Sequence, residues 1–195
     1  MNLRGLLENP VLYELKSRLL SLGRRSVQDY LSSAADLRPD SRILDVGCGA
    51  GGHAEVFSGD FWGVDRNLRC IAYARRRRRG RFLVMDATRL AFPQDSFDFV
   101  YCVGLCHHLS DQQVRATAGE MKRVTRKSGR TLIIDGVFPP KLNLLGYALF
   151  KCDRGRHTRT LGQLEALLAQ EGFRLILRNI SRSFPYRRAV FSYQK

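Results

Sequence analysis

A run of glycines follows a short, mostly apolar segment and is the part of the sequence best suited to bind a ligand. Residues 43–46 lead into Gly47, Gly49 and Gly51. Glycines let the main chain turn sharply and approach a ligand closely, because they carry no Cβ atom. A helix that begins after such a turn offers its unpaired N–H groups to the same ligand. The pattern therefore predicts a site for a nucleotide-like cofactor at the carboxyl end of a sheet.

Three aspartates stand at the ends of three successive predicted strands, and they bear on which cofactor fits. Asp45 lies just before the glycines. Asp65 follows Gly47 by 18 residues, and Asp86 ends the strand after that. The glycine spacing also satisfies the dinucleotide motif G-x-G-x-x-G, with Asp65 placed to accept ribose hydroxyls. However, a carboxylate beside the loop would repel a pyrophosphate and could hold a cation, so three carboxylates favour a positively charged cofactor without phosphate.

The segment from Asp45 to Gly51 resembles a family motif. It reads Asp-Val-Gly-Cys-Gly-Ala-Gly and is similar to the D-x-G-C-G-x-G motif of class I S-adenosylmethionine-dependent methyltransferases, in particular the type 11 group of small-molecule enzymes. The resemblance covers residues 40–137, and residues 95–100 look like the family's fourth-strand motif. It implies that S-adenosylmethionine is the cofactor and that the chain is a methyltransferase enzyme.

The resemblance also implies a role for each matching position. The methionine part of the cofactor would lie against Asp45 and the main chain of the glycine loop. Asp65 would accept both ribose hydroxyls, and Asp86 with Ala87 would face the adenine. The cofactor-binding residues implied in this way are Asp45, Gly47, Cys48, Gly49, Gly51, Asp65, Arg66, Asp86, Ala87 and Cys102.

Two adjacent histidines follow the fourth predicted strand and are the candidate catalytic residues. Methyl transfer is an in-line displacement that needs a base only when the acceptor enters protonated. His107 and His108 lie at the predicted ligand-binding edge, where an imidazole, which titrates near neutral pH, could accept a hydroxyl proton. The alternative is that both shape the pocket or cap the next helix. His108 resembles a histidine found at this point in the type 11 group.

The five cysteines indicate neither a metal site nor a disulfide framework. Their number is odd, they include no C-x-x-C pair, and only four histidines are present. A zinc site would need a second ligand pair at matching spacing. We therefore expect buried thiols in a reducing compartment and no bound metal.

The charge balance is strongly basic, with 33 Lys and Arg against 18 Asp and Glu and a formal net charge of +15. Residues 141–195 hold 11 basic and 3 acidic side chains, and residues 75–79 are five consecutive arginines. Such a field attracts anions. We expect a small-molecule or lipid-like, anionic acceptor, peripheral membrane or RNA contact through the basic patches, and no stable protein partner.

Two other functions stay open at this point. One is an RNA methyltransferase, or a basic module of the same fold that binds nucleic acid or membranes. The base-methylating motif N/D-P-P-Y/F is missing after the fourth strand, where residues 103–106 read Val-Gly-Leu-Cys. The other is an NAD-binding oxidoreductase, which the glycine spacing alone would permit.

Strands and helices must alternate to position these residues. Apolar runs bounded by turns predict strands at 42–46, 61–65, 81–85, 97–103 and 131–137, with helices at about 50–57, 67–79 and 110–126. This alternation predicts an α/β fold, a Rossmann-like, doubly wound sheet of seven mostly parallel strands. A helix at about 160–171, with Thr160 as its N-cap and Gly172 as its stop, precedes an antiparallel hairpin of residues 173–180 and 186–193.

The length predicts a single methyltransferase domain spanning residues 1–195. Within it we expect a helical N-terminal extension at 1–38 with a break at Gly23, a cofactor-binding core at 40–137, and a substrate lid at 141–159 that ends at Arg159. No apolar run reaches 18 residues, and no signal peptide is recognisable. We therefore expect a cytoplasmic protein.

Overall fold

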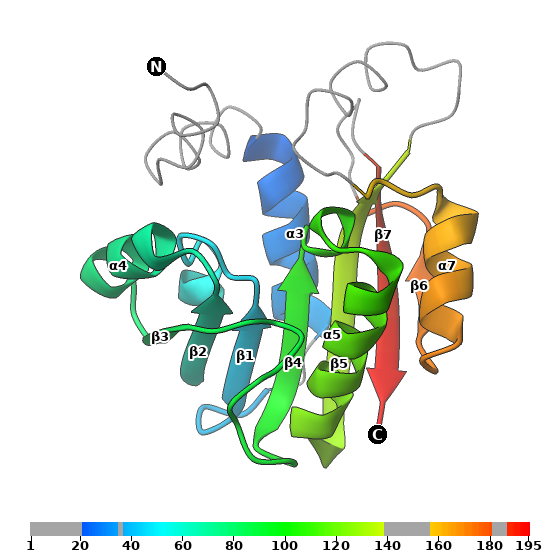
Figure 1. Cartoon of the computed structure of the whole chain (residues 1–195). Coiled ribbons are helices and arrows are strands. Elements are labelled where there is room, and N and C mark those ends of the chain that lie inside the picture. The colour runs from blue at the N-terminus through cyan, green and yellow to red at the C-terminus, as the bar shows by residue number, and fades with distance from the viewer. Residues whose placement is uncertain (1–20, 35–36, 139–156, 181–186) are drawn as a thin grey trace.

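Seven strands form one sheet in the computed structural model of the chain (Figure 1). The structure describes residues 21–34, 37–138, 157–180 and 187–195. The first predicted N-terminal helix and nearly all of the predicted lid lie outside these residues. The domain boundaries and the lid therefore stay predictions.

Strand and helix alternate through most of the chain, and two single 3₁₀ turns, η1 and η2, lie in the loops. In chain order the elements are α3 (Ser21–Ala34), β1 (Arg42–Val46), η1 (Ala54–Val56), β2 (Asp60–Asp65), α4 (Leu68–Arg77), β3 (Arg81–Val84), β4 (Phe97–Val103), η2 (Cys106–His108), α5 (Asp111–Val124), β5 (Thr125–Val137), α7 (Leu161–Ala169), β6 (Arg174–Leu177) and β7 (Arg187–Gln194).

The strand order in the sheet is β3-β2-β1-β4-β5-β7-β6. The first five strands are parallel, whereas β7 runs antiparallel to both of its neighbours, β5 and β6. The Rossmann-like sheet and its antiparallel C-terminal hairpin are thereby confirmed. The order reverses between β1 and β4, and ligands of such sheets bind at this reversal, outside the carboxyl ends of the strands.

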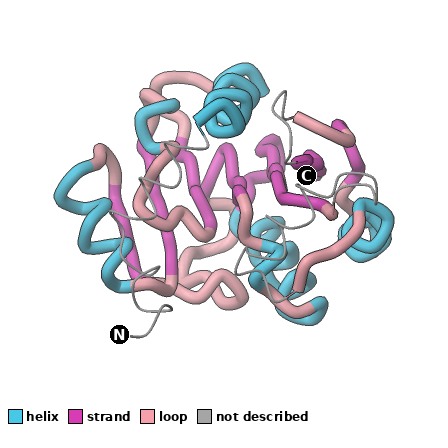
Figure 2. The backbone as a smooth tube through the Cα atoms, turned by 90° about the horizontal axis from the view of Figure 1, so that it is seen from above, coloured by secondary structure: helices cyan, strands magenta, loops and turns pink. Residues whose placement is uncertain are grey.

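Helices cover both faces of the sheet (Figure 2). Successive strand residues point to opposite faces, so Ile43 packs in one core with α3 and α4 while Leu44 packs in the other with α5 and α7. Both cores contain side chains that are fully buried, such as Leu31 on the first face and Met121 on the second. The sheet is therefore a rigid platform, apolar on both sides, and its polar residues collect where the strands end.

Two local predictions are wrong. The helix expected at 50–57 is only the turn η1, because Gly51 adopts a φ of 70° that a right-handed helix does not allow. The break expected at Gly23 is absent, since α3 runs from Ser21 to Ala34 without interruption. By contrast, the N-cap at Thr160 is confirmed: its side chain accepts the Gln163 N–H in a capping box.

Gly63 lets the sheet approach the glycine loop closely. A Cβ atom at this position would lie 2.7 Å from Phe82 Cδ1 and 2.8 Å from Cys48 Sγ, both closer than carbon or sulfur atoms tolerate. The missing side chain thus leaves the space in which Cys48, within the loop, packs against the sheet.

We predict that Gly63→Ala lowers the free energy of unfolding by about 1–3 kcal/mol, because the added methyl group overpacks a buried site. The matched control is Gly119→Ala in α5, where a new Cβ meets nothing within 4 Å. This control should raise the free energy of unfolding by about 0.5–1 kcal/mol through helix propensity. Urea unfolding measures both, and equal effects of the two substitutions would contradict the packing argument.

Candidate functional site

Five parallel strands end at one edge of the sheet, and the sequence-predicted site residues lie in or beside the loops that follow. The loop after β1 contains the glycines, and Asp65 ends β2. Asp86 follows β3, and the two histidines follow β4. The parallel topology therefore gathers residues from distant parts of the sequence at one edge.

The glycine loop is folded back against β2. The N–H groups of Gly47 and Cys48 both donate to the Val64 carbonyl oxygen, at 2.8 and 3.0 Å. Gly47, Gly49 and Gly51 have φ values of 76°, 53° and 70°, in the left-handed region that favours glycine. A Cβ atom on Gly47 would lie 2.9 Å from Leu105 Cδ1, which belongs to the loop after β4. The loops after β1 and β4 are therefore in contact at the reversal of strand order.

Asp65 connects the glycine loop to the end of β2. One carboxylate oxygen accepts the Gly49 N–H at 2.9 Å, and the other accepts the Asn67 N–H at 2.8 Å. Each carboxylate oxygen has a second lone pair, so the side chain retains capacity for ligand hydroxyls. The residue is half-buried, which keeps it accessible from the edge of the sheet.

Asp45 is the most unusual polar residue of the edge. It is 1% exposed, and its Oδ2 atom has no hydrogen-bond partner within the described residues. His53 Nδ1 lies 3.8 Å away, beyond hydrogen-bond distance. Its register partner on β4 is Tyr101, whose buried hydroxyl interacts with the Asp45 carboxylate outside ordinary hydrogen-bond geometry. Burial, together with the Asp45 charge, holds the pKa of Tyr101 well above its usual value.

Asp86 is exposed and caps the short turn that follows β3. Its Oδ1 atom accepts both the N–H and the hydroxyl of Thr88 at 2.8 Å. These bonds lower the pKa of Asp86, and nearby Arg66 adds to the effect. Arg66 is exposed and Ala87 is half-buried, so all three residues are accessible at this end of the site.

The two histidines differ in environment. His107 Nδ1 lies 2.7 Å from Asp135 Oδ1, with the histidine side chain 13% exposed and the aspartate side chain 1% exposed. The other Asp135 oxygen accepts the Cys106 N–H at 2.5 Å. His108 is exposed, and its ring centroid lies 4.1 Å from that of His107. The structure thus gives His107 a buried carboxylate partner.

Asp135 was not anticipated from the sequence. Burial raises the pKa of this carboxyl, but His107 and the hydrogen bonds from the His107 ring and the Cys106 N–H outweigh burial, so the pKa lies below its ordinary value. The signal in the sequence was one acid inside the otherwise apolar strand that runs from Leu132 to Val137. Its partner lies 28 residues earlier in the chain, so only strand pairing shows the contact.

Arg159, the last residue of the expected lid, holds neighbouring loops together. Its side chain is buried and donates to the carbonyl oxygens of Cys106 and Leu109 at 2.9 and 2.8 Å. It also donates to Asp111 Oδ1 at 2.6 Å. The guanidinium therefore fastens the loop after β4 to the segment that leads into α7.

The cysteines that the structure describes, Cys48, Cys70, Cys102 and Cys106, are buried thiols, as expected. The Cys102 side chain is fully buried in the core under α5, so only its main chain could line the cofactor pocket, and that role stays a prediction. Burial and neighbouring carboxylates likewise raise the pKa of Cys48 far above that of an ordinary thiol. Neither thiol is placed for nucleophilic chemistry.

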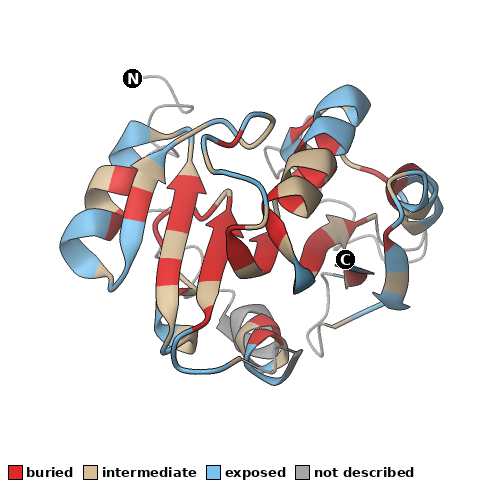
Figure 3. Cartoon of the chain, turned by 90° about the horizontal axis from the view of Figure 1, so that it is seen from below, coloured by how far each residue is buried: buried red, intermediate tan, exposed pale blue. Residues whose placement is uncertain are grey.

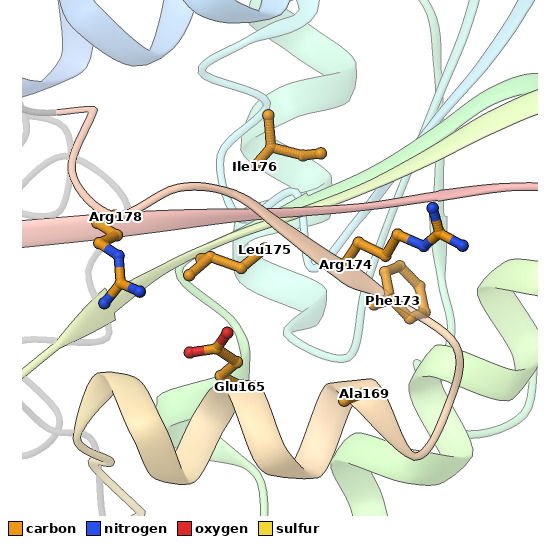
Figure 4. A pocket seen from close by; sticks show the side chains of 7 residues that line it. All are labelled: Glu165, Ala169, Phe173, Arg174, Leu175, Ile176 and Arg178. Carbon is orange, nitrogen blue, oxygen red and sulfur yellow. The ribbon is translucent and has the colours of Figure 1, made fainter.

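Two open surface grooves lie away from the glycine loop. One, of about 450 Å³, runs between α7 and the edge strand β6, with Glu165 on one side and Arg174 and Arg178 on the other (Figure 4). Strands β4, β5 and β7 separate β6 from β1. The second groove, of about 530 Å³, lies between the N-terminal part of α5 and α7. Neither is lined by the glycine loop or the aspartates of the edge.

Comparison with known proteins identifies the family. Residues 43–129 match a family described as a methyltransferase domain. The uncharacterized methyltransferase YcgJ of Bacillus subtilis is 37% identical over 114 residues, which are 54% of this chain and 44% of that protein. A solved structure of YcgJ has a TM-score of 0.65 at 27% identity and covers 78% of this chain and 70% of its own. Residues 43–129 therefore form a domain of the class I S-adenosylmethionine-dependent methyltransferases.

A further relative of this methyltransferase is phosphoethanolamine N-methyltransferase 3 of Arabidopsis thaliana, which is 28% identical over 151 residues. The match covers 73% of this chain and 30% of that protein, so the chain spans less than half the length of the first relatives that it matches. The family resemblance is confirmed, and with it S-adenosylmethionine as the cofactor in place of NAD.

Within 21–34, 37–138, 157–180 and 187–195, no group of three His, Cys, Asp or Glu side chains is arranged to hold a metal ion. In the same ranges, no helix has the length and apolar character needed to cross a bilayer. The cytoplasmic location stays a prediction.

We predict that Asp135→Asn lowers the free energy of unfolding at about pH 7 by roughly 1–3 kcal/mol, because a buried charged hydrogen bond is lost. The pKa of Asp135 is lower in the folded protein than in the unfolded chain. The stability it contributes is therefore present above about pH 4 and disappears as the pH falls through the folded pKa.

Urea unfolding at about pH 7 and pH 3 measures this effect: the difference between Asp135→Asn and the unaltered protein should shrink at the lower pH. Asp40→Asn is the control, because Asp40 and its partner Arg38 are 79% and 78% exposed and their pairing should contribute little. If Asp135→Asn lowers the free energy of unfolding equally at both pH values, the stabilising role of the ionised Asp135 carboxylate is contradicted.

Proposed function

We propose that this methyltransferase binds S-adenosylmethionine at the carboxyl edge of β1, β2 and β3 and methylates a small acceptor that arrives protonated. The observation that carries the proposal is the buried Asp45 carboxylate beside the glycine loop, one oxygen of which has no hydrogen-bond partner among the described residues. Buried polar atoms are normally hydrogen-bonded, so such an atom indicates a missing donor. A cationic ligand would supply it, whereas a pyrophosphate would be repelled.

The residues of the edge fit this cofactor. Asp45 and the main chain of Gly47, Cys48, Gly49 and Gly51 would surround its methionine part. Asp65 would accept hydrogen bonds from the ribose hydroxyls through the lone pairs that its two main-chain contacts leave available. The adenine would lie among Arg66, Asp86 and Ala87. When bound, S-adenosylmethionine supplies the methyl group from its sulfonium centre.

His107 would be the general base of the reaction, and Asp135 would position it. A carboxylate that accepts the Nδ1 proton selects the tautomer in which Nε2 is unprotonated, so Nε2 would take the proton from the acceptor. Asp135 also stabilises the imidazolium that forms, because the two groups are 2.7 Å apart and buried. Arg159 and the Asp135 bond to the Cys106 N–H would hold the loop in place.

The acceptor class follows from this base and from the charge of the chain. A proton acceptor is required for a hydroxyl or an ammonium group, but not for a nucleophile that is already deprotonated. The net charge of +15 favours an anionic molecule. One relative is named a phosphoethanolamine N-methyltransferase. Phosphoethanolamine carries a negatively charged phosphate group and an ammonium group. We therefore propose a small or lipid-like anionic acceptor whose nucleophile is an amine or a hydroxyl.

Calorimetric titration with S-adenosylmethionine tests the cofactor site. Asp65→Ala is expected to weaken binding at least 30-fold, since it removes charge-assisted hydrogen bonds that contribute about 2 kcal/mol or more. Asp60→Ala is the matched control, because Asp60 begins the same strand and lies at its opposite end. No binding by the unaltered protein, or equal losses in the two variants, would sink the proposed site.

Methyl transfer to phosphoethanolamine, followed with a labelled methyl group over a range of pH, tests the base. His107→Gln should lower kcat by about 10²–10⁴-fold and remove the acidic limb of the pH profile. Asp135→Asn should lower kcat and shift that limb to a different pH. If His108→Gln lowers kcat and His107→Gln does not, the proton acceptor is His108 and the role proposed for Asp135 is wrong.

A further inference from the structure

One side of the molecule is strongly basic, and most of it lies outside the site described above. Residues 66–89, which include α4 and β3, contain nine arginines and one acid. Arg76, Arg77 and Arg79 are exposed, and among the described residues no carboxylate pairs with them. Arg75 differs, because its Nε atom donates to the Phe82 carbonyl oxygen at 2.7 Å. The outer side of α4 is accordingly mostly exposed (Figure 3).

The same side carries two of the four large apolar side chains that the described residues expose. Leu68, the first residue of α4, is 65% exposed, and Val84, the last residue of β3, is 46% exposed. Val84 is the register partner of Asp65, and Leu68 follows Asp65 by three residues. Both aliphatic side chains therefore lie at the carboxyl edge, beside the proposed cofactor site. Arg66 and Arg69, which are exposed, flank Leu68.

The types of exposed side chain distinguish two kinds of polyanionic partner, a single-stranded nucleic acid and an anionic lipid surface. Proteins that bind single-stranded nucleic acid stack its bases on exposed aromatic rings. Within the described ranges no Phe, Tyr or Trp is exposed, on this side or any other. A lipid surface instead takes aliphatic side chains into the boundary between headgroups and acyl chains and binds arginines through its anionic headgroups.

We propose that the surface formed by α4 and β3, the α4 surface, docks on an anionic phospholipid membrane. The arginines at the C-terminal end of α4 contact headgroups, and Leu68 and Val84 enter the interface. Because those two residues adjoin Asp65, docking brings the edge of the sheet with the proposed cofactor site to the membrane. This inference goes beyond the proposed function. Vesicle binding is measured without cofactor or acceptor, so the docking proposal and the proposed function can fail independently of each other.

Co-sedimentation of the full chain with vesicles tests the docking. The probes are vesicles of pure phosphatidylcholine and vesicles with about one third phosphatidylglycerol. Binding is expected only to the anionic vesicles. Combined Arg76→Gln, Arg77→Gln and Arg79→Gln should weaken it at least 10-fold. Leu68→Ser should weaken it about 3-fold or more without changing the net charge.

The matched control alters three exposed arginines at the opposite edge of the sheet, Arg174, Arg178 and Arg187, to Gln, with the same loss of charge. Little change is expected there, because charges more than about 10 Å from the membrane are screened. Circular dichroism verifies that every variant folds. Equal losses in the two triple variants, equal binding to both vesicle types, or no effect of Leu68→Ser would overturn the proposal. Displacement from the vesicles by a tighter-binding oligo-uridine would assign the surface to RNA instead.

Discussion

Carboxylates at the carboxyl edge of the sheet hold the loops on which the site depends. Asp65 accepts the N–H groups of Gly49 and Asn67, and Asp135 accepts the N–H of Cys106. A parallel strand that stops leaves main-chain N–H groups without partners, and an acid at the end of a neighbouring strand satisfies them. Asp45 differs, because one of its oxygens has no hydrogen-bond partner among the described residues. The difference between Asp45 and the others is what points to a ligand.

Positive charge is used in two different ways in this chain. Arg159 is buried, and its donors are taken up by main-chain carbonyl oxygens and by Asp111, so it contributes rigidity to the loop after β4. The arginines at the end of α4 are exposed, and the structure shows no carboxylate for Arg76, Arg77 or Arg79 among the described residues. The first kind of arginine holds the fold together, while the second leaves a net field at the surface.

Strand positions were predictable because a buried parallel strand is a continuous apolar run between turn residues. For that reason β1 and β4 occupy the residues expected for them. The helix expected at residues 50–57 is absent. Gly51 has a left-handed backbone conformation, which a right-handed helix cannot include. The helix break predicted at Gly23 was also wrong, because a glycine weakens a helix but does not have to end it, and α3 continues through this position.

The sequence by itself determined the strands of the sheet, the glycine loop and the three aspartates Asp45, Asp65 and Asp86. Each of these is visible in a short stretch of residues, and each aspartate stands at or next to the end of its own strand. Only the tertiary structure decided the rest. Pairing of β4 with β5 brings Asp135 to His107 across 28 residues, and Arg159 reaches Cys106 across 53. It also showed that the Cys102 side chain faces the core and that one oxygen of Asp45 has no hydrogen-bond partner among the described residues. Contacts of this kind depend on which strands become neighbours, and a local pattern of residues does not contain that information.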